Sequence, residues 1–426
     1  MKANCFKWMS LAAVAAMTMC VACDDDDDDA QLGPVNPIPP VVTAYSSELF
    51  LNEANHNAIN YDFGGLFTNK YIGVVEGGED MPQIDHFFDA ANYRGAVSAD
   101  NDWTAGWVRL SGNGNETSKG AAEVLQGILT TDKTLKSGLT YALDGEYIVK
   151  GGAVLTIEPG VKIVAKTADE SVDYILVEQG AKIMAEGTKD APIVMTSDRK
   201  EAGAWGGLHI CGRAHTNVEG GQGVSEIGNA AYGGSDEADN SGVLRYVRME
   251  NTGYALDSEH EANGITFYGV GSGTEVEYVQ TYNGSDDGFE FFGGHVNMKH
   301  MVVVDCTDDS FDWTEGWNGK AQFLVAYQQN PDCDCLMECD NNGKNFEAQP
   351  VSCPTIANAT LIGNNGTKQG IRLRAGTQVK LYNTLVTGKE KCLTTETLPT
   401  EQALINGNSV LKYVTLATDI ECNGNK

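Results

Sequence analysis

The feature that most constrains the fold is a 22-residue repeat in the second half of the chain. The segment 285–291, SDDGFEF, matches 307–313, TDDSFDW, and the flank 279–282 falls on 301–304 at the same shift. A fixed period of about 20–50 residues is typical of solenoids, in which each coil buries its apolar side only against its neighbours. The sequence therefore predicts a stack of coils.

Looser copies of the repeat share the order small, apolar, polar, apolar, at 207–210, 264–267, 288–291, 310–313 and 370–373. Successive side chains of a strand point to opposite faces, so each copy predicts a short strand with its apolar residues inward. The polar members should form one outward column: His209, Thr266, Glu290, Asp312 and Arg372. A coil of 22 residues leaves room for three short strands and three bends.

From residue 140 onward, short apolar runs alternate with Gly and Asp, which is the pattern of strands separated by turns. The segment 151–161, GGAVLTIEPGV, resembles the opening coils of right-handed parallel β-helices. We therefore expect an all-β fold, a right-handed parallel β-helix over 140–426. Residues 44–139 are less regular, with a short helix at 121–129, and are expected to form an N-terminal cap or small subdomain.

The region 203–327 carries the motifs WGGL, SGVLRYVR, DDGFEFFGG and DWTEGW. They resemble a group of bacterial surface or secreted lipoproteins of β-helical fold. The resemblance covers about residue 93 to the end of the chain, and it implies architecture and location more than chemistry. DWTEGW at 312–317 also has a near copy, DWTAGW, at 102–107.

The N-terminal residues read as an export signal. Residues 1–22 combine Lys2 and Lys7 with a short apolar run, which is typical of a secretory signal peptide. Val-Ala-Cys at 21–23 resembles the lipoprotein cleavage box, which implies lipidation, such as palmitate, at Cys23. The aspartates 24–29 resemble the surface-export signal of Bacteroidota lipoproteins, and 23–43 would be an acidic, Pro-rich tether. These features imply an outer-membrane protein facing outward; a periplasmic lipoprotein with an acidic linker stays an alternative.

The formal charge of −30 disfavours nucleic-acid binding, because a polyanion repels phosphate backbones. Acidic polymers would also be repelled, except at local basic positions or through bridging cations. The charge therefore restricts the partners more than it identifies them.

Carboxylates gather beside the predicted column. Coils about 4.8 Å apart would crowd the six side chains Asp286, Asp287, Glu290, Asp308, Asp309 and Asp312. Calcium, which takes oxygen ligands, would relieve this repulsion. The alternative is that these aspartates only hydrogen-bond within their own turns. Paired carboxylates also suit glycoside hydrolysis, and a lyase could use calcium with Arg372 or Arg374 as the base.

Further candidates are aromatic residues and cysteines. Trp103, Trp107 and Trp317 lie beside glycine and polar residues and could be exposed platforms for sugar rings, or packing at junctions; Trp313 is expected in the core. His209 and Arg372 are candidate ligand-binding residues of the column. The histidines show no metal spacing. Cys333, Cys335, Cys339 and Cys353 are disulfide candidates, because an even number of cysteines in an exported chain favours pairing; a zinc site is the alternative.

The sequence favours a lipid-anchored surface protein that captures or presents a glycan or peptide, as an accessory to a TonB-dependent outer-membrane importer. Two alternatives stay open: a β-helix polysaccharide lyase or glycoside hydrolase, and a structural or adhesive surface protein.

Overall fold

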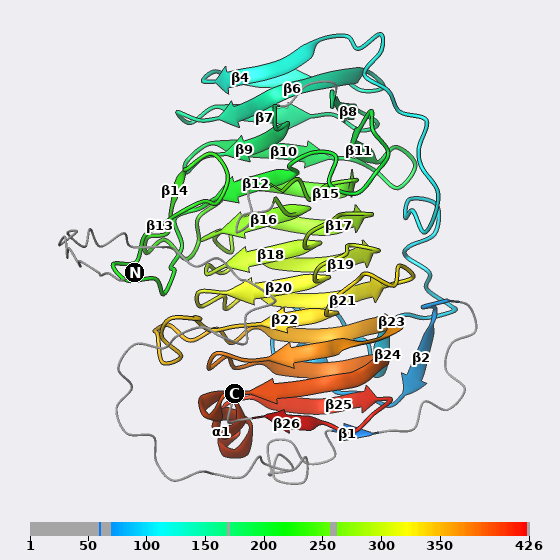
Figure 1. The fold of residues 1–426 in the computed structure, drawn as a ribbon, viewed down its shortest axis with the longest axis vertical. Helices are drawn as coiled ribbons and strands as arrows, with labels where there is room; N and C mark the ends of the chain where they lie inside the picture. Colours follow the sequence, from blue (N-terminus) through cyan, green and yellow to red (C-terminus); the bar gives the residue numbers. More distant parts are fainter. Residues whose placement is uncertain (1–58, 61–69, 168–170, 256–261, 424–426) are drawn as a thin grey trace, which may run out of the picture.

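The computed structural model describes residues 59–60, 70–167, 171–255 and 262–423; the signal, Cys23 and the tether lie outside this part. Twenty-two strands form one continuous sheet wound into a stack of coils, from β4 (Val124–Leu129) at one end to β26 (Glu421–Asn423) at the other (Figure 1). Every described pairing within this sheet is parallel, and in the middle of the stack each strand pairs with the next strand but one in the chain. The prediction of an all-β parallel β-helix is confirmed.

Each coil has three sides, which we name sheets I, II and III. Sheet I contains β9 (Tyr174–Val177), β12 (Leu208–Cys211), β16 (Ile265–Tyr268), β18 (Phe289–Phe292), β20 (Phe311–Thr314), β22 (Met337–Cys339) and β26. Sheet II contains β5 (Lys133–Leu135), β7 (Val154–Ile157) and β10 (Lys182–Glu186), and sheet III contains β8 (Lys162–Ala165) and β11 (Ile193–Ser197).

Longer strands bend from one side to the next. Bent strands that run from sheet II into sheet III are β15 (Gly242–Glu250), β17 (Glu275–Tyr282), β19 (Asn297–Val304), β21 (Lys320–Tyr327) and β25 (Val410–Leu416). β4 and β6 (Thr140–Val149) run from sheet III into sheet I, while β23 (Thr355–Leu373) and β24 (Lys380–Glu396) pass through all three.

The register confirms the repeat read from the sequence. Phe289 pairs with Phe311 and Val279 with Met301, each 22 residues apart. Glycine precedes the sheet I strands β12, β16 and β18, where the coils approach closely: a Cβ on Gly288 would lie 2.6 Å from the carbonyl oxygen of Ser310. Three strands and three bends per coil follow from this period.

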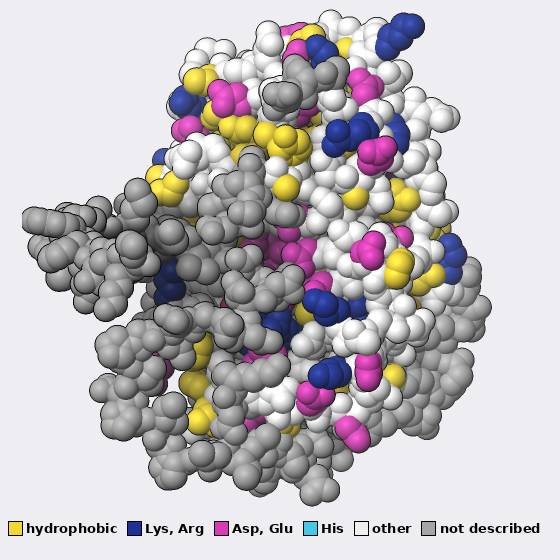
Figure 2. Space-filling model, viewed as in Figure 1, with side chains coloured by type: hydrophobic (Ala, Val, Ile, Leu, Met, Phe, Trp, Pro, Cys, Tyr) yellow, Lys and Arg dark blue, Asp and Glu magenta, His cyan; other side chains and the backbone are white. Residues whose placement is uncertain are grey.

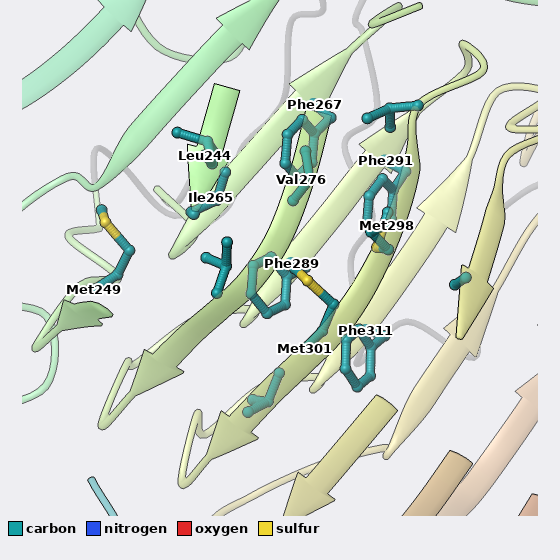
Figure 3. Packing of buried hydrophobic residues seen from close by; sticks show 14 of the residues in the cluster. Leu244, Met249, Ile265, Phe267, Val276, Phe289, Phe291, Met298, Met301 and Phe311 are labelled. Carbon is teal, nitrogen blue, oxygen red and sulfur yellow. The ribbon is translucent and has the colours of Figure 1, made fainter. Parts of the chain in front are cut away.

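The inward residues form one apolar core along the stack. Phe267 stacks on Phe291 with ring centroids 5.3 Å apart, and Phe289 on Phe311 at 5.7 Å (Figure 3). Trp313 is 1% exposed and belongs to this core, as predicted. Equivalent residues of successive coils thus lie directly over one another.

The bend between sheets II and III carries a second ladder. Tyr246, Tyr278, His300 and Phe323 occupy equivalent positions with positive φ, and their neighbouring rings stack 4.4, 4.2 and 4.9 Å apart. Two asparagines, 358 and 383, continue the column with φ of 55° and 51°. Asparagine tolerates this left-handed conformation, whereas the aromatic residues adopt it with the support of their stacked rings.

The described part of the N-terminal region, 70–123, runs along the side of the coils and does not cover the end that it precedes. It contains β2 (Gly73–Glu76), the 3₁₀ helix η3 (Met81–Gln83) and β3 (Tyr93–Val97), and β3 contacts β21, β23, β24 and β25. The helix expected at 121–129 is wrong, because β4 occupies Val124–Leu129 and begins the stack. The coils therefore start before residue 140.

The two ends of the stack differ. At the first coil, Val124 and Ile128 are 42% and 53% exposed. At the other end, α1 (Leu398–Asn406) places Leu404 in the core, and β1 (Ile59–Asn60) pairs in parallel with β25 (Figure 1). The hairpin β13 (Gly223–Val224) and β14 (Ala231–Tyr232) lies in the connection between β12 and β15, and Tyr232 packs on Tyr268 of sheet I. Among the described residues, no helix has the length and apolarity needed to cross a bilayer.

Candidate functional site

The predicted polar column exists on sheet I. His209 pairs with Thr266, Thr266 with Glu290, and Glu290 with Asp312. The column then continues through a residue that the sequence pattern missed, Glu338, which lies between Asp312 and Arg372. Figure 2 shows Asp and Glu side chains gathered near the middle of this face, with Lys and Arg side chains below them.

Glu338 was missed because a large residue, Leu336, stands where the other copies have a glycine or serine near the strand start. The alternation of Met337, Glu338 and Cys339 still has the apolar-polar-apolar order of the other copies. That shorter signal could have identified it.

The six predicted carboxylates come together, as the stacking argument required. One ligand atom from each of Asp286, Asp287 and Asp308 lies within 4.8 Å of the other two, and the same holds for Asp287, Glu290 and Asp312. Asp309 belongs to a third group, with Cys335 and Glu338. We call these carboxylates, together with Glu338, the acidic cluster.

Crowding and burial change the acidity of the cluster. Burial raises the pKa of Asp287 well above its ordinary value, and the nearby carboxylates of Asp308 and Asp312 raise it further. Burial likewise raises the pKa of Glu290, with Glu226 and Asp312 contributing. Both carboxyls therefore hold a proton more tightly than a solvated acid does, unless a cation compensates.

Two aspartates of the acidic cluster bind backbone groups of the following coil. The carboxylate of Asp287 accepts a hydrogen bond from the backbone N–H of Asp309 at 2.9 Å. Asp309 in turn accepts one from the backbone N–H of Cys335 at 2.6 Å. These bonds join coils, which differs from the expected alternative of bonds within one turn, and they hold the two carboxylates in place.

Arginines border the acidic cluster on one side. Arg372 lies 2.8 Å from Glu338 and 3.4 Å from Glu396, and Arg374 lies 2.6 Å from Glu338 and 2.8 Å from Asp340. Burial alone would lower the pKa of Arg372, but the carboxylates of Glu338 and Glu396 raise it above its ordinary value. Arg372 is not suited to accept a proton, because two carboxylates hold its guanidinium and its pKa is raised.

His209 is not exposed, contrary to the prediction of an outward ligand-binding residue. It is 1% exposed, its Nε2 lies 2.6 Å from the carbonyl oxygen of Gly206, and its ring stacks on Tyr268. Burial lowers the pKa of His209 to about 4. The apolar cluster that includes Tyr232 of the β13–β14 hairpin and Tyr268 lies over this part of sheet I.

The predicted exposed tryptophan platforms are wrong. Trp103, Trp107 and Trp317 are 7%, 1% and 2% exposed. Trp103 and Trp107 pack on the aromatic ladder at Tyr278, whereas Trp317 stacks on Phe291 inside the core at 4.3 Å. All three tryptophans therefore pack against other residues, which was the alternative interpretation. Trp103 and Trp107, from the first copy of the motif, lie outside the coil wall, whereas Trp317, from the second copy, lies inside it.

The predicted disulfides are also contradicted. All eight described cysteines are free thiols, among them Cys333, Cys335, Cys339 and Cys353. Cys339 lies in the apolar core, and burial raises its pKa well above the ordinary value. Cys339 thus packs as a small apolar side chain, whereas the thiol of Cys335 lies 3.4 Å from the carboxylate of Asp334.

A family model described as a pectate-lyase-like β-helix domain matches residues 127–425, which is 299 of the 426 residues. The chain belongs to this family. The match begins within β4, so it agrees with a stack that starts before residue 140. Neither the comparison with curated proteins nor that with solved structures found a match.

Proposed function

We propose that the protein binds an acidic polysaccharide along sheet I through a divalent cation, calcium, held by Asp286, Asp287 and Asp308. The observation that carries the proposal is the close approach of these three carboxylates, whose ligand atoms lie within 4.8 Å of one another. An all-oxygen donor set suits calcium, which takes six to eight oxygen ligands. A cation there would offset the burial and the carboxylate repulsion that raise the pKa of Asp287.

The chemical class of the ligand follows from the family and the charge. The family description refers to a lyase of pectate, an acidic polysaccharide. A chain with a formal charge of −30 would repel such a polymer. A cation shared between protein and sugar carboxylates removes that repulsion, and a flat stack of strands offers an extended surface to a long chain.

Binding without cleavage is favoured by the state of the arginines. A lyase needs a base, and Arg372 is engaged by Glu338 and Glu396 and has a raised pKa. We further propose that Cys23 anchors the protein to the outer face of the outer membrane, where it would pass its ligand to a TonB-dependent importer.

The test measures retention of the full chain on immobilised polygalacturonate, with a neutral polysaccharide as the reference matrix. We expect retention in calcium and release by EDTA. Asp308→Asn should lose most of the retention, whereas Asp332→Asn, which changes an exposed aspartate outside the acidic cluster, should keep it. The proposal would be contradicted if retention were the same with and without EDTA and the same for Asp308→Asn as for the unmodified chain.

A second candidate, glycoside hydrolysis, is favoured by one observation. Asp287, Glu290 and Asp312 each place an atom within 4.8 Å of the others, and burial raises the pKa of Asp287 and Glu290. A raised-pKa carboxyl beside a second carboxylate is the acid and nucleophile arrangement of retaining enzymes. New reducing ends released from a polysaccharide panel, and lost in Asp312→Asn, would support this candidate over pure binding.

A further inference from the structure

A group of two histidines and one glutamate lies apart from the acidic cluster, in the loops that follow the sheet I strands. His215 follows β12, Glu237 lies between β14 and β15, and His295 follows β18. One ligand atom from each lies within 4.8 Å of the other two. Sequence spacing gave no sign of this group, because His215 and Glu237 lie in the long connection between β12 and β15, whereas His295 comes from a different coil, between β18 and β19.

The protonation of His215 can be assigned from its contacts. Its Nε2 lies 2.7 Å from the carbonyl oxygen of Gly316, which can only accept, so Nε2 carries the hydrogen. Asn318 does not compete for that position, because its amide donates to the carbonyl oxygens of Gly316 and Val351. In the neutral ring, Nδ1 is therefore a bare lone pair.

The Nδ1 lone pair of His215 faces the carboxylate of Glu237. His215 Nδ1 lies 2.7 Å from Glu237 Oε2, and His295 Nδ1 lies 3.5 Å from the same oxygen. His295 Nδ1 is itself buried and has no hydrogen-bond partner among the described residues. Two ring nitrogens that converge on one carboxylate oxygen need a positive charge between them, either a second proton on His215 or a metal ion.

We propose that His215, Glu237 and His295 form a binding site for a first-row transition metal, with Zn²⁺ as the fitting ion. Two imidazoles and one carboxylate are a ligand set that zinc takes in proteins, leaving a fourth position open. Zinc bonds of about 2.0–2.2 Å in a tetrahedron separate ligand atoms by roughly 3.3 Å. The separation of 3.5 Å already fits, and Glu237, whose side chain is 48% exposed, can open the 2.7 Å contact.

The backbone holds the three ligands in place. The N–H of Gly294 donates to the carbonyl oxygen of His215, the N–H of His295 to that of Val270, and the N–H of Ser272 to that of Glu237. Gly293 and Gly294 have φ of +63° and +80°, and a Cβ on Gly294 would lie 2.5 Å from the oxygen of Val270. Only glycine permits the turn that presents His295.

The hydrogen bond from His215 Nε2 to Gly316 has the form of an outer contact that orients a metal-binding histidine. The site lies near the surface, because the side chains of Glu237 and His295 are 48% and 36% exposed, although the Nδ1 atom of His295 is itself buried. The site would thus accept water or an oxygen atom of a bound ligand, independently of the calcium proposed on sheet I.

The test is a calorimetric titration of the full chain, stripped with EDTA, with ZnCl₂. We expect one zinc ion per chain at this site, with affinity lowered by about tenfold or more in Glu237→Gln and in His295→Ala. His86→Ala, which removes an exposed histidine elsewhere, and Asp308→Asn, in the acidic cluster, should leave this affinity unchanged. Circular dichroism verifies that each variant is folded.

Cobalt supplies the second readout, since its visible spectrum distinguishes nitrogen and oxygen ligands from thiolates. A spectrum without thiolate bands, lost in Glu237→Gln and His295→Ala, is expected. The proposal is overturned if no zinc binds, if these variants bind zinc like the unmodified chain, or if the cobalt spectrum reports cysteine ligands. Failure of polygalacturonate retention would leave this site untouched, so the two proposals fail separately.

Discussion

The same coils carry two outer faces of opposite character. On sheet III, Tyr282, Val302, Val304 and Val325 point outward and are buried beneath the N-terminal segment that contains Trp103 and Trp107. On sheet I, the equivalent outward positions of neighbouring strands hold Glu290, Asp312 and Glu338. Both faces are built on one repeat, so the difference lies in the outward side chains alone. The apolar face packs against the N-terminal segment, whereas Glu290, Asp312 and Glu338, which are 5%, 3% and 1% exposed, place buried carboxylates on the other face.

Polar side chains specify where the N-terminal segment attaches. Gln280 donates to the carbonyl oxygen of Arg109 at 2.6 Å and accepts from its N–H at 2.7 Å. Gln322 makes the same pair of bonds with Asp89, at 2.9 and 2.8 Å. Each glutamine thus satisfies the backbone of the covering segment as a further strand would, and Thr360 and Arg248 add bonds to the backbone of Ala96 and Trp107.

The largest effect is expected from removing the aromatic cover of sheet III. Trp107→Ala empties a site that is 1% exposed and is expected to lower the free energy of unfolding by about 3–5 kcal/mol. Trp107→Phe keeps the packing on Tyr246 and should cost less. Denaturant unfolding measures both; a stability equal to that of the unmodified chain in Trp107→Ala would show that the cover contributes little.

The glutamine attachments give the next effect. Gln322→Ala leaves the backbone N–H and C=O of Asp89 without their side-chain partner and should destabilise by about 1–3 kcal/mol. Hydrogen exchange of the segment around Asp89 should rise before that of the coils. Gln83→Ala, at an exposed position, is the matched control, and equal exchange in the two variants would refute the attachment.

The acidic face should respond to pH in the opposite sense to an ordinary salt-bridged acid. The pKa of Glu290 is raised in the folded state above its unfolded value of about 4.3, so its stabilisation is present at low pH and is lost as pH rises through the folded pKa. The free energy of unfolding should fall by at most about 1.4 kcal/mol per pH unit because of this one proton. In metal-free buffer, Glu290→Gln should weaken this pH dependence of the free energy of unfolding. Calcium added to the unmodified chain should weaken it too. The same pH dependence in Glu290→Gln and in the unmodified chain would show that Glu290 is not its source.

The smallest effect is expected on sheet II, which lies between the two faces. Glu275 pairs with Arg245 at 2.7 Å, with side chains 60% and 30% exposed. Glu275→Gln should change the free energy of unfolding by less than about 1 kcal/mol, because exposed ion pairs contribute little. A melting temperature close to that of the unmodified chain is the expected reading, and a loss comparable to Gln322→Ala would show that this pair is more important than its exposure suggests.

The sequence by itself predicted how the coils stack and which side chains point outward. Its 22-residue period and alternation predicted the register of Phe289 with Phe311 and the outward column from His209 to Arg372, because a strand's two faces can be read at a period of two. The gathering of Asp286, Asp287 and Asp308 followed from the same stacking. Tertiary structure decided which outward positions stay accessible, since burial of Trp107 or His209 depends on a distant segment that no local pattern announces. It also decided the meeting of His215, Glu237 and His295, because the connections between strands vary in length and have no fixed period that a sequence could reveal.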